Sequence, residues 1–196
     1  MKKEYIKYMD LQILHRNEFG KLLDQLNLKG LGAEIGVCEG KFSRVLLDNT
    51  KLYMLYLIDP WKDYGTVSLG FRNLPQEKQD RLYSNVVKNT QKYGDRVQII
   101  RNESVKASSF FSDETFDFVY IDANHSYKYV KEDIAYWYPK VRKGAILAGH
   151  DYMDGIIKGV DYGVKRAADE FCAANNKKIY TTSGLRKRAR SWYFIK

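Results

Sequence analysis

The chain has 196 residues, enough for one domain with a hydrophobic core, and a formal net charge of +9, which favours an acidic partner or surface. Hydrophobic residues make up 44% of it, so a globular protein is expected rather than a disordered one, and no apolar run reaches the length of a membrane span. The basic N-terminus has no apolar signal segment after it, and the two cysteines suit free thiols, so a cytoplasmic location is expected.

Strands and helices are predicted to alternate along the chain. Leucines recur at helical spacing over 8–27, which predicts an amphipathic helix there. Apolar runs predict strands at 31–37, 52–59, 97–100, 116–122 and 145–149. Helices are expected at 40–49, 76–93, 104–111, 127–138 and 163–173, with Gly94 ending the second of these and Ser104 capping the third. A last pair of strands is expected at 178–182 and 191–195.

This alternation is typical of an α/β fold with a Rossmann-like, doubly wound sheet. The sheet is expected to be mostly parallel, with a C-terminal antiparallel strand and an N-terminal helix. Because no internal repeat or Pro/Gly linker is present, residues 1–196 are expected to form one domain, with a helical extension over 1–30 and a cofactor-binding core over 31–196. Two roles stay open for the extension: a cover over the acceptor pocket, or a contact in a homodimer.

A glycine turn follows the first strand of the core, in the pattern Glu34-x-Gly36-x-x-x-Gly40, and the next strand ends at Asp59. Ligands of such sheets bind outside the carboxyl ends of the strands, where a glycine turn lets the backbone approach a cofactor and a carboxylate can bind ribose hydroxyls. Glu34 would repel a pyrophosphate and would suit a cationic ligand instead. The absence of Gly-Lys-Ser/Thr excludes a P-loop.

These motifs resemble those of the class I S-adenosylmethionine-dependent methyltransferases, over about residues 31–196. The pattern is similar to the small-molecule and sugar O-methyltransferases. The resemblance implies S-adenosylmethionine as cofactor, with the glycine motif at its methionine part, the end of the second strand at its ribose, and the segment after the third strand at its adenine. The residues that it implies for cofactor binding are Glu34, Gly36, Gly40, Asp59, Glu103, Ser104 and Asp122.

The loops after the fourth and fifth strands carry the candidate catalytic residues His125, His150 and Asp122. An unperturbed histidine titrates near neutral pH, so either histidine is a candidate base. Relatives that methylate hydroxyls with Mg²⁺ hold the metal with an aspartate after the fourth strand and an acidic pair after the fifth. The resemblance therefore implies Asp122, Asp151 and His150 as metal ligands. Because His150 replaces the first acid of the pair, Mn²⁺, Fe²⁺ or Zn²⁺ would suit this set better than Mg²⁺.

The expected function is methylation of a hydroxyl group on a small molecule, sugar or glycan. Two alternatives stay open: an RNA or protein methyltransferase that uses the basic run at 186–190, and a non-catalytic cofactor-binding module. Nucleic acid is possible but not favoured as a partner. The fourth strand does not end in Asn/Asp-Pro-Pro-aromatic, the signature that binds a flipped base, which speaks against amino-methylation of bases. The basic run is either a solvated hairpin tip or a docking patch for phosphate, nucleic acid or anionic lipid. Segments 61–75 and 152–162 are either lids or ordinary packing.

Overall fold

The computed structural model describes residues 12–65, 74–157, 159–183 and 190–196. Its helices are η1 (Arg16–Glu18), α2 (Phe19–Gln25), α3 (Lys41–Asn49), α4 (Gln76–Thr90), η2 (Gln91–Arg96), α5 (Ser104–Ser108), α6 (Tyr127–Trp137) and α7 (Val164–Ala174). Its strands are β1 (Leu31–Ile35), β2 (Met54–Asp59), β3 (Val97–Arg101), β4 (Phe116–Ile121), β5 (Val141–Gly149), β6 (Asp154–Ile157), β7 (Val160–Gly163), β8 (Tyr180–Thr181) and β9 (Trp192–Ile195). Within these residues, no helix is both long and apolar enough to cross a bilayer.

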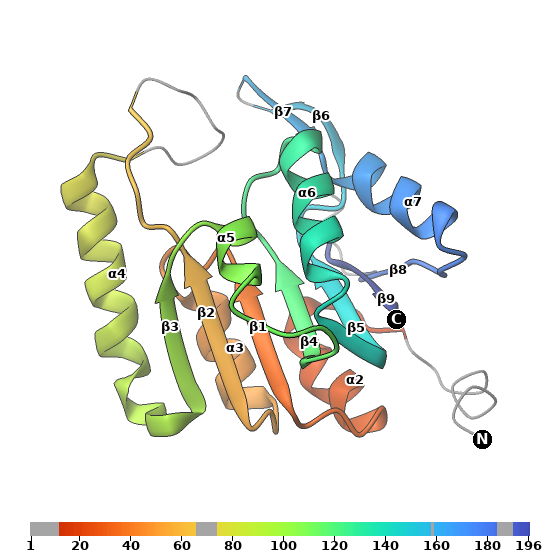
Figure 1. Cartoon of the computed structure of the whole chain (residues 1–196), viewed down its shortest axis with the longest axis horizontal. Coiled ribbons are helices and arrows are strands. Elements are labelled where there is room, and N and C mark those ends of the chain that lie inside the picture. Colours follow the sequence, from red (N-terminus) through yellow and green to blue (C-terminus); the bar gives the residue numbers. More distant parts are fainter. Residues whose placement is uncertain (1–11, 66–73, 158, 184–189) are drawn as a thin grey trace.

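Seven strands form one sheet in the order β3-β2-β1-β4-β5-β9-β8 (Figure 1). The pairs β1–β2, β2–β3, β1–β4 and β4–β5 are parallel, and β9 pairs antiparallel with both β5 and β8. The predicted Rossmann-like sheet and its C-terminal antiparallel strand are confirmed. The chain runs outward from β1 to β3 and then returns to β4 on the other side of β1, and this reversal opens a crevice where such sheets bind ligands.

Burial explains why the central strands read as continuous apolar runs. Every residue of β4 is buried, because helices cover both faces of the sheet. Helices α2 and α3 lie behind the sheet in Figure 1, and α5 and α6 lie in front of it. Phe19 of α2 packs its ring against Phe118 and Tyr120 of β4 and Tyr193 of β9, with ring centroids 5.2 to 5.6 Å apart. This aromatic cluster joins the N-terminal helix to the core of the sheet.

The N-terminal helix is shorter than predicted. The structure places a 3₁₀ turn at Arg16–Glu18 and an α-helix at Phe19–Gln25, while residues 12–15 are not helical and the rest of the predicted start lies outside the described residues. The cause is local: His15 has an extended backbone, and its Nδ1 accepts the backbone N–H of Asn17 at 3.2 Å. That hydrogen bond caps the first turn, so the helical segment begins after His15.

The boundaries of two other helices also differ from the predictions. Helix α4 ends at Thr90, and a 3₁₀ segment continues past Gly94, whose φ of 55° interrupts it rather than ending the α-helix. Ser104 is the first residue of α5 and does not cap it, since the cap position belongs to Glu103. The Ser104 hydroxyl instead donates a hydrogen bond to Asp133 of α6.

Strands β6 and β7 form an antiparallel hairpin that covers most of the segment 152–162, which was predicted to be either a lid or ordinary packing. In Figure 1 the hairpin stands beyond the carboxyl ends of the parallel strands, beside α6. The backbone N–H of Gly163 donates to the carbonyl oxygen of His125 at 2.9 Å, which ties the hairpin to the loop after β4. The hairpin is therefore part of the wall around the carboxyl ends of the sheet.

Candidate functional site

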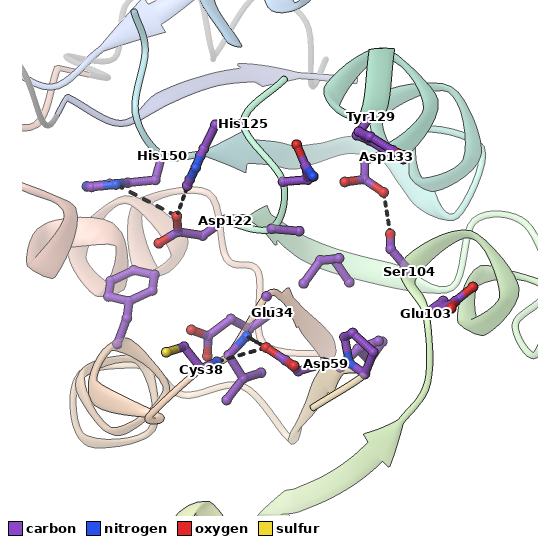
Figure 2. Close-up of a pocket in the computed structure, with 18 of the residues that line it drawn as sticks. Glu34, Cys38, Asp59, Glu103, Ser104, Asp122, His125, Tyr129, Asp133 and His150 are labelled. Atoms are coloured by element: carbon purple, nitrogen blue, oxygen red, sulfur yellow. Dashed lines mark hydrogen bonds and ion pairs between the residues drawn. The ribbon is translucent and has the colours of Figure 1, made fainter. Parts of the chain in front are cut away.

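A cavity of about 880 Å³ opens at the carboxyl ends of β1, β2, β4 and β5. This volume lies in the upper part of the usual range for ligand pockets, about 300–1,000 Å³. Figure 2 shows Glu103, Ser104 and Asp133 on one side of the cavity and Asp122, His125 and His150 on the other, with Glu34 and Asp59 between them at its base. Every sequence-predicted site residue except Gly40 lines this one cavity.

The glycine turn brings β1 into contact with the loop after β4. Gly36 has φ of +88°, and a Cβ there would lie 2.2 Å from the carbonyl oxygen of Asp122, so only glycine fits. Gly40 has φ of +68° and stands at the start of α3, with the side chain of Val86 nearby. Gly36 thus lines the cavity beside the candidate catalytic loop, whereas Gly40 lies outside the lining, where the turn enters α3.

Asp59 holds the glycine turn through its carboxylate. Its Oδ2 accepts the backbone N–H groups of Val37 and Cys38 at 3.0 and 2.9 Å, and its Oδ1 accepts that of Trp61 at 2.8 Å. A carboxylate has about four acceptor positions, so about one is left for a ribose hydroxyl. The predicted ribose contact remains a proposal, and Asp59 has in addition a structural task that the sequence did not indicate.

Glu34 is almost fully buried below the cavity, with 1% of its surface exposed. Burial raises the pKa of Glu34 to about 8, although the Ser43 hydroxyl, which donates to its Oε2 at 2.5 Å, acts in the opposite direction. The side chain therefore holds a proton at neutral pH. A cation bound beside Glu34 would favour its ionised form, which keeps the predicted preference for a cationic ligand.

The far side of the cavity contains a carboxyl group that sequence reasoning missed. Asp133 accepts a hydrogen bond from Ser104, whose oxygen in turn accepts the indole N–H of Trp137 at 2.9 Å. Burial raises the pKa of Asp133 to about 7. Glu103 is half exposed and pairs with Lys62 at 3.1 Å. The predicted adenine residues Glu103 and Ser104 are thus both present here, with Asp133 as a third polar group.

Two aspartates and two histidines meet on the opposite side, after β4 and β5 (Figure 2). His125 Nε2 lies 3.1 Å from an Asp151 oxygen and 3.5 Å from an Asp122 oxygen. His150 Nδ1 lies 3.2 Å from Asp151 and 3.8 Å from Asp122. The structure therefore brings together all four residues predicted for catalysis and metal binding.

Neighbouring charges shift the pKa values of two residues in this cluster, His125 and Asp151, in opposite directions. Burial lowers the pKa of His125, but the hydrogen bond to Asp122 and the charges of Asp122 and Asp151 outweigh it, so the pKa is raised overall. Burial raises the pKa of Asp151, and the neighbouring His150, His125 and Arg16 more than reverse that effect, so the pKa is lowered overall. The cluster therefore favours the ionised form of Asp151 and the protonated form of His125.

Among the described residues, Asp122, His125 and Asp151 each place one potential metal-ligand atom within 4.8 Å of the other two. The predicted metal set names His150 in place of His125. His150 faces the same two carboxylates, so both imidazoles border one potential cation site. Two carboxylate oxygens and an imidazole nitrogen are a fitting donor set for a divalent transition metal.

Two further residues that sequence reasoning missed touch the cluster. Arg16 of η1 lies 3.3 Å from Asp122, and its guanidinium sits over the ring of Phe42 at 4.6 Å. Tyr162 of the β6–β7 hairpin stacks on His125, with ring centroids 4.8 Å apart and an interplanar angle of 4°. Both come from segments without a recognisable motif, so no sequence signal pointed to them.

Three residues in and beside the cavity have a backbone conformation that is unfavourable for them. Cys38, Trp61 and Asp151 follow the carboxyl ends of β1, β2 and β5 with φ of 52°, 39° and 48°. Such left-handed conformations are unfavourable for residues other than glycine, and they cluster at functional sites. Trp61 is fully buried and donates its indole N–H to the carbonyl oxygen of Cys38 at 3.0 Å, so it is packed beneath the cavity and is not part of a lid.

Two predicted features lie mainly outside the described residues. Of the basic run at 186–190, only Arg190 is described. Of the predicted lid at 61–75, residues 66–73 are not described. Tyr64, at the start of that segment, lines the cavity.

Comparisons with known proteins agree with this architecture. An O-methyltransferase from Bacillus cereus in complex with S-adenosylhomocysteine is similar over 100% of this chain and 90% of its own, with 15% identity and a TM-score of 0.63. An O-methyltransferase of tomaymycin synthesis from Streptomyces achromogenes, in complex with S-adenosylmethionine, is similar over 99% of this chain and 86% of its own, with 14% identity and a TM-score of 0.63. At these identities the likeness concerns the fold. No curated protein matches the chain.

A family model described as a methyltransferase domain matches residues 33–152. The matched segment begins in β1, just before the glycine turn, and ends after His150 and Asp151, so it contains every predicted site residue. Since the match covers more than half of the sequence, the chain belongs to this family of methyltransferase domains, whose cofactor is S-adenosylmethionine.

Proposed function

We propose that this protein binds S-adenosylmethionine in the cavity and methylates a hydroxyl group of a small molecule or a sugar. The cluster around His125 carries the proposal. An imidazole that lies 3.1 Å from one carboxylate and 3.5 Å from another, at one side of a cofactor-sized cavity, is a suitable general base for a hydroxyl. A hydroxyl needs such help, because it is a poor nucleophile until its proton is removed or weakened.

The chemistry of the cavity fits the cofactor. Glu34 and Asp122 provide carboxyl groups near a positively charged methionine part, and Asp59 keeps room for a ribose hydroxyl. Ser104 and Asp133 offer polar groups to an adenine on the far side. When bound, the cofactor supplies a methyl group on a sulfonium, which leaves as a neutral thioether once the methyl carbon bonds to the acceptor oxygen.

His125 is proposed to accept the acceptor's hydroxyl proton at Nδ1, because Nε2 faces the carboxylates of Asp151 and Asp122 and donates its N–H to them. The carboxylates of Asp122 and Asp151 stabilise the imidazolium that forms, which is consistent with the raised pKa of His125. Stacking on Tyr162 holds the plane of the ring. His150, on the other side of the two carboxylates, is the second candidate base. A divalent cation would be held by Asp122 and Asp151 with one of the histidines, and it would weaken the O–H bond of the acceptor.

The test is methyl transfer to a panel of hydroxylated acceptors, followed through formation of S-adenosylhomocysteine. Replacing His125 by Asn should lower kcat by about 10²- to 10⁴-fold while leaving the calorimetric affinity for S-adenosylhomocysteine unchanged. The same change at His15 is the matched control, because His15 is exposed and only caps η1, and it should leave turnover unchanged. Full turnover by the His125→Asn variant would remove that residue from the mechanism.

A second arm of the experiment addresses the metal. Turnover is measured after dialysis against EDTA and again after addition of Mg²⁺, Mn²⁺ or Zn²⁺. Recovery with Mn²⁺ or Zn²⁺ above that with Mg²⁺ is expected from the imidazole in the donor set. Turnover that is independent of metal would leave proton transfer to histidine as the only activation. Transfer to RNA alone, with no small hydroxylated acceptor accepted, would contradict the proposed acceptor class.

A further inference from the structure

Arg16 is a cation at the part of the cavity where Glu34 and Asp122 also lie. It comes from η1, before the first strand of the core, and so lies outside the segment that matches the family model. Its guanidinium lies over the ring of Phe42 at 4.6 Å and reaches Asp122 with Nη1 at 3.3 Å. About 27% of the side chain stays exposed, so part of the guanidinium remains accessible to a ligand in the cavity.

The cofactor of this family carries three charges at its methionine end: a sulfonium, an ammonium and a carboxylate. Glu34 and Asp122 supply carboxyl groups for the positive charges, but the carboxylate needs a cation or free N–H donors. The N–H groups of Val37 and Cys38 in the glycine turn are already donated to Asp59. These two N–H donors of the turn are therefore not available to the carboxylate of a ligand.

The other described lysines and histidines that line the cavity are engaged elsewhere. Lys41 is 73% exposed and pairs with Glu39 at 2.6 Å. Lys62 pairs with Glu103 on the adenine side. Both histidines of the cluster face Asp151. Among the described cations that line the cavity, Arg16 is therefore the remaining candidate to bind the cofactor's carboxylate, and it lies beside both Phe42 and Asp122.

We propose that Arg16 binds the carboxylate of the cofactor's methionine part, so that the N-terminal extension completes the cofactor site. A guanidinium has five donors in a planar fork that matches a carboxylate. Arg16 uses this fork for its contacts to Asp122 and Tyr120, and further donors remain for a ligand. Stacking on Phe42 holds the plane of the fork beside Asp122, whose carboxylate would face the neighbouring ammonium group of the cofactor. This inference rests on S-adenosylmethionine as the cofactor and does not depend on which acceptor is methylated.

The experiment compares two ligands by calorimetry: S-adenosylhomocysteine and its decarboxylated analogue, which keeps the amine and lacks only the carboxylate. The wild-type protein should bind S-adenosylhomocysteine at least about tenfold more tightly than the analogue. Arg16→Gln should lose about tenfold in affinity for S-adenosylhomocysteine and less than about twofold for the analogue. Lys21→Gln is the matched control, because Lys21 is an exposed cation of the same segment, paired with Glu18, and it should bind both ligands as the wild type does.

The outcomes separate this inference from the cofactor assignment. If the wild type binds both ligands equally, or if Arg16→Gln weakens both equally, Arg16 does not bind the carboxylate, although the cofactor assignment stands. If the wild type binds neither ligand, the cofactor assignment fails and this inference fails with it. Should Arg16→Gln unfold, as judged by circular dichroism, Arg16→Lys keeps the charge without the fork and should lose affinity for S-adenosylhomocysteine selectively, by a smaller factor. Unchanged affinity of a folded Arg16→Gln variant would overturn the proposal.

Discussion

Replacing Asp59 by alanine should destabilise the whole protein, because this carboxylate ties the glycine turn to the end of β2. The change leaves three backbone N–H groups without their acceptor, those of Val37, Cys38 and Trp61. Each hydrogen bond of this kind contributes about 1 kcal/mol net, so the free energy of unfolding should fall by about 3 kcal/mol. Water that enters the cavity would hydrogen-bond to some of these N–H groups. The expected cost is therefore about 1 kcal/mol for each of them, rather than the up to about 3 kcal/mol of a buried donor left without any partner.

Urea unfolding measures the effect directly. With a slope of about 2 kcal/mol per molar urea, a loss of about 3 kcal/mol moves the midpoint down by about 1.5 M. Glu103→Ala is the matched control, since that carboxylate lies at the same edge of the sheet but is 52% exposed and, among the described residues, pairs with Lys62 and Tyr64. Its effect should stay below about 1 kcal/mol. An Asp59→Ala midpoint equal to that of the wild type would refute the idea that this carboxylate braces the turn.

Three other predictions concern the backbone, the pH dependence and the hairpin. Gly36→Ala should destabilise by well over the ~1 kcal/mol expected from a left-handed φ alone, because its Cβ would overlap the backbone after β4; Gly144→Ala, with φ of +80° and nothing within 4 Å, should show only that ~1 kcal/mol in the same urea assay. The raised pKa of Glu34 means that the native protein keeps a proton that the unfolded chain releases above its ordinary value of 4.5. The unfolding free energy of the wild type should therefore fall by about 2.5 kcal/mol relative to that of Glu34→Gln between about pH 6 and about pH 8.5. Equal pH dependence of the two proteins would contradict the raised pKa of Glu34. Tyr162→Phe should keep the stack on His125 and retain turnover, whereas Tyr162→Ala should lower kcat by about tenfold without changing affinity for S-adenosylhomocysteine; equal turnover of both variants would show that the stack does not position the imidazole.

Periodicity and strand ends predicted the frame of the molecule and most of the site. Buried parallel strands need continuous apolar runs, so β1, β2, β4 and β5 are visible in the sequence as such runs. Ligand groups in these sheets gather at one edge, so Asp59, Asp122 and Asp151 could be placed together before any coordinates. Asp133 could also have been predicted from the sequence, because it is a charged residue on the face of α6 that buries Val130, Ile134 and Trp137.

The remaining parts depend on tertiary contacts that have no local signature. Arg16 reaches the cavity only because α2 packs its Phe19 into the sheet and thereby positions the turn before it. Tyr162 meets His125 only through the hairpin, which forms from a glycine-containing segment that reads equally well as a loop. The predicted cap at Ser104 was wrong for a related reason, because a buried partner on α6 binds its hydroxyl more favourably than the helix terminus does.

At the residues with left-handed backbone conformations beside the cavity, thermal stability and activity make opposite demands on the amino acid. Glycine at Cys38 or Asp151 would relieve about 1 kcal/mol of backbone strain at each position. A selection for heat resistance alone would therefore favour glycine there, and it would discard a carboxylate that faces two imidazoles in the process. Thermostable variants from such a selection should accumulate glycines at these strand ends and lose turnover together with them, whereas a selection that also demands activity should look for its gains on the opposite edge of the sheet.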